Sequence, residues 1–194
     1  MAWLDAGTRN FYTVKTPIET PADLKGLKIR VQQSPTNVEM MRLLGGTATP
    51  MGFGDVYTAL QAGILDGAEN NELALTDNGH GDICKYYSYD MHQMVPDLLV
   101  ANYEFLHGLS DDERLIFEEG FELVKETEQN AWADAVSIAK DKAENEQHVH
   151  FLYPDTAPFQ EAMAPLHTSV LKANPELQPI YDLIQAYNAA HQAD

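Results

Sequence analysis

Two segments of the chain carry side chains that could bind a small ligand. Arg30 stands near the end of an alternating apolar and polar stretch at 27–31, and Glu69 and Asn70 directly follow an apolar stretch at 64–68. A guanidinium is a permanent cation with several N–H donors, and amides and carboxylates also hydrogen-bond polar ligands. If both stretches are strands of one parallel sheet, their carboxyl ends meet at the edge where such sheets bind ligands. We therefore expect the polar tail at 69–71 to face a ligand crevice opposite Arg30.

The pattern around these residues predicts the elements that must position them. Glycines and a Ser-Pro pair mark helix ends, and β-branched residues mark strands. The expected elements are a helical turn at 20–26, a strand at 27–31, a helix from Ser34 to 45–46, a strand at 47–49, a helix at 55–62 and a strand at 64–68. The side chains expected to face the core are Val38, Met41 and Leu44 in the first helix and Val56, Ala59 and Leu60 in the second. This order predicts a βαβαβ unit with a parallel sheet.

The second half of the chain predicts a long helix between shorter elements. Residues 94–103 (MVPDLLVANY) resemble a strand that crosses between lobes. Ser110 and Glu113 form a capping box at the head of a helix that could run to about Glu146. Its expected apolar face consists of Phe117, Phe121, Val124, Trp132, Val136 and Ala139. A strand around 149–152 and helices within 156–172 and 176–190 complete the prediction.

The composition indicates a globular and strongly acidic chain. Of 194 residues, 44% are hydrophobic and 9% aromatic, which suffices for a core, and no apolar run approaches the roughly 20 residues that span a bilayer. The net charge of −18 argues against nucleic acid and anionic membranes as partners. This acidity suits solubility or a salty habitat. An anionic ligand would need a local cation such as Arg30.

The remaining reactive side chains give weak signals. Cys84 is the single cysteine, so no internal disulfide is expected, and the N-terminus lacks the pattern of a signal peptide. His80, Cys84 and His92 fall within a short turn-rich segment, which alone does not predict a metal site. His148 and His150 alternate and are expected at the surface. No nucleophile elbow or phosphate-binding glycine loop is recognisable. We expect no catalytic residue, no metal and no cofactor.

The stretch GLKIRVQQSPTNVEMMRLLGGTATPMGFGDVYTALQAGILDGAEN resembles the solute-binding proteins of tripartite ATP-independent periplasmic (TRAP) transporters, of the DctP dicarboxylate and sugar-acid type. The matching elements are the DLKGLKIRV strand, the GG-x-x-TPM turn, the DVYTALQAGILDGAEN helix and strand, and the long helix that follows. Together they cover roughly residues 7–165. The resemblance implies an α/β, periplasmic-binding-protein-like (type II) fold, in which two lobes close on a ligand.

The resemblance also implies a set of ligand-binding residues. The arginine that forms a bidentate salt bridge with the ligand carboxylate in this family matches Arg30, and a planar guanidinium suits that geometry. The family's asparagine beside it matches Asn70, and its aromatic wall matches Phe53. A second arginine matches Arg9. Gln32 and Glu69 are further candidates, as contacts to ligand hydroxyl groups. An ion pair with a nearby cation is the alternative for Glu69.

Compared with the family, the chain lacks a counterpart of the first-lobe segment at the N-terminus. We expect residues 8–95 to form the second-lobe α/β core. Residues 96–135 would be a remnant of the first lobe and the start of a connector helix, and residues 136–194 the rest of that helix and C-terminal helices packed on the second lobe. Exposed lobe surface would then favour a homo-oligomer.

The function implied by the resemblance is that of a periplasmic receptor without enzymatic activity. It would bind a small carboxylate and deliver it to TRAP membrane subunits. The GAENN ending favours a sugar acid over a C4-dicarboxylate. One alternative is a truncated, non-transporting lobe that acts as a self-associating interaction protein. An enzyme acting on sugar acids has the weakest support.

Overall fold

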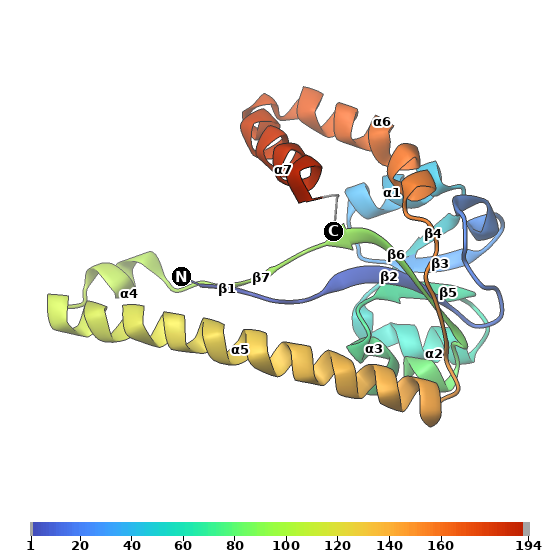
Figure 1. Ribbon diagram of the computed structural model, residues 1–194, viewed down its shortest axis with the longest axis horizontal. Helices are drawn as coiled ribbons and strands as arrows, with labels where there is room; N and C mark the ends of the chain where they lie inside the picture. Colours follow the sequence, from blue (N-terminus) through green and yellow to red (C-terminus); the bar gives the residue numbers. More distant parts are fainter. Residues whose placement is uncertain (1, 192–194) are drawn as a thin grey trace.

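The computed structural model describes residues 2–191 and shows a six-stranded mixed sheet between two helical layers, with a long helix that extends beyond them (Figure 1). The strand order is β4-β3-β5-β2-β6-β8. These strands are β2 (Thr8–Thr13), β3 (Lys28–Val31), β4 (Thr47–Pro50), β5 (Gly67–Asn70), β6 (Tyr86–Met94) and β8 (His150–Leu152). The helices around the sheet are α1 (Pro35–Leu44), α2 (Val56–Gln61), α3 (Leu73–Thr76), α5 (Asp111–Asn145), α6 (Ala157–Ala173) and α7 (Gln178–His191).

The predicted βαβαβ unit is confirmed. Strand β3 pairs in parallel with both β4 and β5, and α1 and α2 are the two crossovers. The helical turn expected at 20–26 is the 3₁₀ helix η1 (Pro21–Leu24). The sheet becomes mixed because β2 lies antiparallel between β5 and β6. The carboxyl ends of β3, β4 and β5 therefore share one edge.

Strand β5 begins later than the sequence predicts. Gly63 adopts a left-handed conformation with φ 68° at the end of α2. The amide of Ile64 then donates to the carbonyl of Ala59 at 2.9 Å, so this part of the chain still caps the helix. Ile64 is exposed as a result. The shift places Glu69 and Asn70 inside the strand, where successive side chains point to opposite faces.

Each face of the sheet is covered by its own helices. Helices α1 and α6 cover one face, and α2, α3 and the end of α5 cover the other (Figure 1). The first core contains Phe11, Ile18, Leu24, Ile29, Val31, Met40, Met41, Leu44, Phe159 and Met163. The second contains Tyr12, Val56, Ala59, Leu60, Leu65, Ala68, Ala74, Leu75, Cys84, Tyr87, Ala143 and Val149. In α1, the expectation for Val38 is wrong: Val38 is exposed and Met40 is buried, because the buried stripe of α1 is turned toward α6.

Helix α5 begins with the predicted capping box. Ser110 and Glu113 bond to each other's backbone amides, and the helix ends close to the predicted residue. Only its C-terminal part packs on the sheet, through Ala139 and Ala143. Within residues 2–191 no helix combines the length and apolar character that a membrane span requires.

The other half of α5 lies beside a small arm. This arm consists of β1 (Ala2–Leu4), β7 (Asp97–Leu99) and α4 (Tyr103–His107), and β1 pairs antiparallel with β7 (Figure 1). The strand expected at 94–103 is therefore too long. Phe117, Phe121 and Val124 of the predicted apolar face line a groove of about 290 Å³ beside β7. Phe117 and Val124 are exposed there.

Candidate functional site

Arg30 lies at the shared carboxyl edge of the parallel strands. It is opposite Ala68 of β5 and only 4% exposed. Its Nε and Nη2 donate to the carbonyl of Met51 at 3.1 and 2.9 Å. Its Nη1 has no hydrogen-bond partner within residues 2–191, and no carboxylate of this range forms a salt bridge with it. Burial lowers the pKa of Arg30, yet an arginine stays charged in proteins. The site therefore contains an unneutralised cation.

Phe53 and Asn70 flank this cation. The ring of Phe53, in η2 (Phe53–Asp55) after β4, has its centroid 5.4 Å from Cζ of Arg30 and is 38% exposed. Asn70 lies on the same face of β5 as Ala68, and hence on the same face as Arg30. Its Oδ1 accepts from the amide of Asn71 at 2.9 Å. Its Nδ2 donates to no described residue, so Asn70 and Arg30 both retain free donors.

Arg9 and Glu69 form a buried ion pair next to these donors. Nε of Arg9 lies 2.5 Å from Oε2 of Glu69, and Nη2 donates to Oε1 at 3.0 Å. The same Nη2 also donates to the carbonyl of Glu69, and Nη1 donates to Oδ1 of Asn70 at 2.9 Å. Of the two interpretations of Glu69, the structure shows the ion pair with a cation. The charge of Arg9 is thus neutralised within the protein.

The expectation that the whole polar tail faces Arg30 is wrong. Glu69 lies opposite Phe11 and points toward α1 and α6, whereas Arg30 points toward α2 and α3. Asn71 donates through Nδ2 to the carbonyl of Ala6 at 3.1 Å. Only Asn70 of the tail shares the face of Arg30, because the strand alternates at these residues.

His92 completes the buried charge cluster on the Glu69 side. Its Nδ1 lies 2.6 Å from Oδ2 of Asp90 and its Nε2 lies 3.7 Å from Oε2 of Glu69. The imidazole stacks on Phe11 with centroids 4.2 Å apart. Burial alone would lower the pKa of His92, but Asp90 and Glu69 together raise it to about 9. The sequence-based prediction did not include His92 in the site. The Asp-x-His spacing in a strand, which places both side chains on one face, is the signal that could have found it.

Gln32 follows the end of β3. Its Oε1 accepts from Nδ2 of Asn37 in the first turns of α1 at 3.2 Å. The side chain is half-buried. It thus lies beyond the carboxyl end of β3, bonded to α1, and its contact with a ligand stays a prediction.

The histidines and the cysteine named above occupy separate environments. His80 pairs with Tyr12, His92 pairs with Asp90, and Cys84 is packed in a core where burial raises the pKa of its thiol to about 12. In the described part of the chain, no three His, Cys, Asp or Glu residues cluster as metal ligands would.

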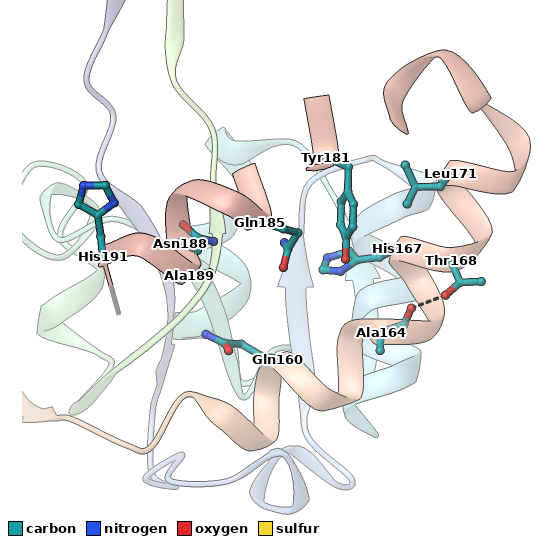
Figure 2. Close-up of a pocket in the computed structure, with 10 residues that line it drawn as sticks. All are labelled: Gln160, Ala164, His167, Thr168, Leu171, Tyr181, Gln185, Asn188, Ala189 and His191. Carbon is teal, nitrogen blue, oxygen red and sulfur yellow. Dashed lines mark hydrogen bonds between the residues drawn. The ribbon is translucent and has the colours of Figure 1, made fainter. Parts of the chain in front are cut away.

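A large cavity lies elsewhere in the molecule. It has a volume of about 940 Å³ and lies between α6 and α7 (Figure 2). Its lining includes His167, Tyr181, Gln185 and Asn188 and none of the predicted ligand-binding residues. Because α6 covers the face opposite to Arg30, this cavity is separate from the predicted site.

Comparison with known proteins identifies the family. The family model described as bacterial extracellular solute-binding protein, family 7 (DctP), matches residues 1–174. The chain belongs to this family. A curated relative, the protein YiiZ of Salmonella typhimurium, is 42% identical over 185 residues, which are 95% of this chain and 56% of YiiZ. The chain therefore spans little more than half the length of that relative.

Similar solved structures agree. The TRAP periplasmic solute-binding protein of Anaerococcus prevotii, with bound D-glucuronate, is 61% identical with a TM-score of 0.91, covering 97% of this chain and 61% of that chain. The one from Roseobacter denitrificans, with β-D-glucuronate, is 37% identical with a TM-score of 0.91 and coverage of 95% and 61%. The one from Xanthobacter autotrophicus, with β-D-galacturonate, is 36% identical with a TM-score of 0.88 and the same coverage. The predicted family and fold class are confirmed.

Proposed function

We propose that this chain is the ligand-binding part of a TRAP solute receptor that captures a small sugar acid through its carboxylate. The observation that carries the proposal is the uncompensated guanidinium of Arg30 at the carboxyl edge of the parallel strands. A guanidinium with a free Nη1 offers a carboxylate the charge and the donors that it needs. The glucuronate and galacturonate bound to similar proteins support a uronate-like ligand.

The roles of the individual residues follow from their contacts. Arg30 binds the carboxylate, Asn70 donates to a ligand oxygen through its free Nδ2, and Phe53 packs against the ligand beside Arg30. Arg9 and Glu69 act differently, because they position Asn70. Glu69 pairs with Arg9, and Nη1 of Arg9 donates to Oδ1 of Asn70, which leaves Nδ2 of that amide to face the ligand. Gln32 is a further contact at the end of β3.

A single unpaired cation among the described site residues favours a monocarboxylate over a dicarboxylate. Arg9 is neutralised by Glu69, so of the two predicted ligand-binding arginines only Arg30 lacks a carboxylate partner within residues 2–191. A second ligand carboxylate would meet the carboxylates of a chain with a net charge of −18. Hydroxyl groups carry no such penalty. The charge balance thus supports a sugar acid over a C4-dicarboxylate.

The wider role is part of the same proposal, because the chain spans only part of the length of its relatives. The similar structures are of periplasmic proteins; the periplasm as the site of action, delivery to TRAP membrane subunits and the absence of catalysis are proposed by family membership. The boundaries at 8–95, 96–135 and 136–194 are part of the proposal as well. Nothing in the comparisons supports the alternative of a non-transporting interaction protein, and self-association stays a prediction.

The test is to titrate the protein with D-glucuronate, D-galacturonate and succinate and to measure binding by calorimetry or by NMR chemical-shift changes. Arg30→Met should weaken uronate binding by about 2–5 kcal/mol, the range for removing one partner of a buried charge pair. Arg42→Met, at an exposed arginine paired with Glu39, is the matched control and should bind as wild type does. Unchanged uronate binding in Arg30→Met would refute the proposal. Tighter binding of succinate than of either uronate would refute the sugar-acid preference.

A further inference from the structure

His80 lies behind the ligand-facing side chains and makes one clear hydrogen bond. It begins η3 (His80–Asp82), is 1% exposed, and its Nδ1 lies 2.7 Å from the hydroxyl of Tyr12. Its ring centroid is 5.5 Å from that of Phe53, the aromatic side chain that contacts Arg30. His80 therefore adjoins the site through Phe53, although neither the sequence pattern nor the family resemblance assigns it a role there.

The partner of His80 determines which ring nitrogen carries the proton. Tyr12 is fully buried, and burial raises the pKa of its hydroxyl well above 10, so it keeps its proton. Within residues 2–191 the only hydrogen-bond partner of this hydroxyl is Nδ1 of His80. A buried hydroxyl needs an acceptor, so Nδ1 accepts and the proton of the neutral imidazole resides on Nε2.

The ring also stays uncharged. Burial, and to a lesser extent the charge of Arg30, lower the pKa of His80 to about 4. At neutral pH His80 is therefore a neutral donor close to the cation that binds the carboxylate. A neutral donor suits a hydroxyl or ether oxygen, whereas a second cation would attract a second carboxylate.

This donor has no partner among the described residues. Nε2 of His80 makes no hydrogen bond with a described residue, and it lies on the ring edge away from Nδ1 and Tyr12. The rings of Phe53 and Tyr57 lie near the imidazole, with centroids 5.5 and 6.5 Å from its own. Both are more than one third exposed and, four residues apart on consecutive helical turns, they share a face. A nearly buried donor without a partner is unfavourable unless a ligand or water accepts from it.

We propose that His80 is a further specificity-determining residue, which donates its Nε2–H to a hydroxyl or ring oxygen of the sugar while Arg30 holds the carboxylate. This inference rests on the proposed function and deepens it. The exposed rings of Phe53 and Tyr57 would then pack against the C–H face of the same sugar ring. The proposed ligand is thus a cyclic acid. Its hydroxyl or ring oxygen reaches His80 while its carboxylate is bound by Arg30, which an open-chain dicarboxylate does not offer.

Two probes separate this role from a structural one. D-Glucuronate has a carboxylate and ring oxygens, whereas cyclohexanecarboxylate has a carboxylate on a ring without oxygens. His80→Asn keeps an acceptor for Tyr12 but lacks the Nε2 donor. This variant should weaken the binding of D-glucuronate about three- to tenfold, the range for one neutral hydrogen bond. It should change the affinity for cyclohexanecarboxylate less than about twofold. His150→Asn, at an exposed histidine of β8, should change neither.

A second variant and a reference variant make every outcome decisive. Tyr12→Phe keeps His80 but removes the hydroxyl that fixes its tautomer, so it should also weaken the binding of D-glucuronate but not that of cyclohexanecarboxylate. If His80→Asn does not fold, Tyr12→Phe tests the role of His80 in its place. If the variants lose affinity equally for both probes, or lose none, the role of His80 is overturned. The proposed function still stands in that case, provided that Arg30→Met abolishes binding of both probes. Binding that survives in Arg30→Met, or a wild-type chain that binds neither probe, would overturn both.

Discussion

Arg9 and Glu69 form an ion pair that spans β2 and β5, with both carboxylate oxygens bound by the guanidinium. Glu69 is fully buried, and His92 faces the same carboxylate from β6. Together with His92, the pair joins three neighbouring strands at the edge of the proposed ligand site. Because the pair neutralises Arg9, it leaves Arg30 as the cation that we assign to the ligand.

The first prediction concerns this pair. Arg9→Met leaves a buried carboxylate without its main partner and should lower the free energy of unfolding by about 3–5 kcal/mol. Arg9→Met/Glu69→Gln removes the stranded charge and should recover at least half of that loss. Urea unfolding measures both. Arg42→Met, which breaks the exposed pair with Glu39, should cost less than about 1 kcal/mol. An Arg9→Met loss no larger than this control would contradict the prediction.

The sequence predicts the parallel unit well because its signals are local. Gly45 and Gly63 end helices through left-handed conformations with φ values of 86° and 68°, and Pro35 begins one. Such signals depend on residues that are neighbours in the chain. The carboxyl edge, and with it the position of Arg30, followed from the order of these elements alone.

The pairing of the charged residues could not be predicted in the same way. The strand that contains Glu69 starts after Gly63 and Ile64 have capped α2, and a shift of one residue in a strand exchanges its faces. The partners Arg9 and His92 come from strands far away in sequence, so their contact depends on the register of β2 against β5 and β6. No local sequence signal of the kind that marks helix ends reveals that register. The neutralised Arg9 and the free Arg30 were therefore indistinguishable beforehand.

A second prediction concerns pH. The pKa of His92 is raised to about 9 in the folded protein from an ordinary value of 6.5. A raised pKa contributes stability that is fully present below pH 6.5 and lost as the pH rises through 9. The free energy of unfolding should therefore fall on the order of 3 kcal/mol between pH 6 and pH 9.5. His92→Gln should flatten this part of the profile. A wild-type profile with the same slope as His92→Gln would show that His92 is not the titrating group.

A third prediction concerns the attachment of α5. Nζ of Lys140 lies 5.4, 5.5 and 5.1 Å from the ring centroids of Tyr89, Phe151 and Tyr153. Lys140→Met keeps the apolar stem but loses the cation–π attraction and should destabilise the chain by about 1–2 kcal/mol. Lys140→Arg should retain most of the stability. Thermal unfolding measures both. Lys125→Met, at a lysine paired with Glu122 one helical turn away, is the control, and an equal effect of the two methionine variants would refute the role of the rings.

The last prediction separates ligand binding from folding at Asn70. Its Oδ1 accepts from Nη1 of Arg9 and from the amide of Asn71, whereas its Nδ2 is free. Asn70→Asp preserves the accepting oxygen, so the fold should keep its stability within about 1 kcal/mol. The variant also replaces the free donor with a second carboxylate oxygen beside the ligand carboxylate.

Repulsion between the two carboxylates and the loss of the Nδ2 donor should together weaken the binding of D-glucuronate at least about tenfold, since each effect is of the order of 1 kcal/mol or more. The exposed Asn102, which caps α4 in the arm, provides the matched control, because Asn102→Asp adds the same charge away from the site and should change affinity less than about twofold at physiological salt, where distant charges are screened. Calorimetric titration and urea unfolding of both variants decide between the two roles. Retained affinity in Asn70→Asp would remove Asn70 from the ligand contacts, and an equal loss in both variants would point to net charge rather than to the free amide.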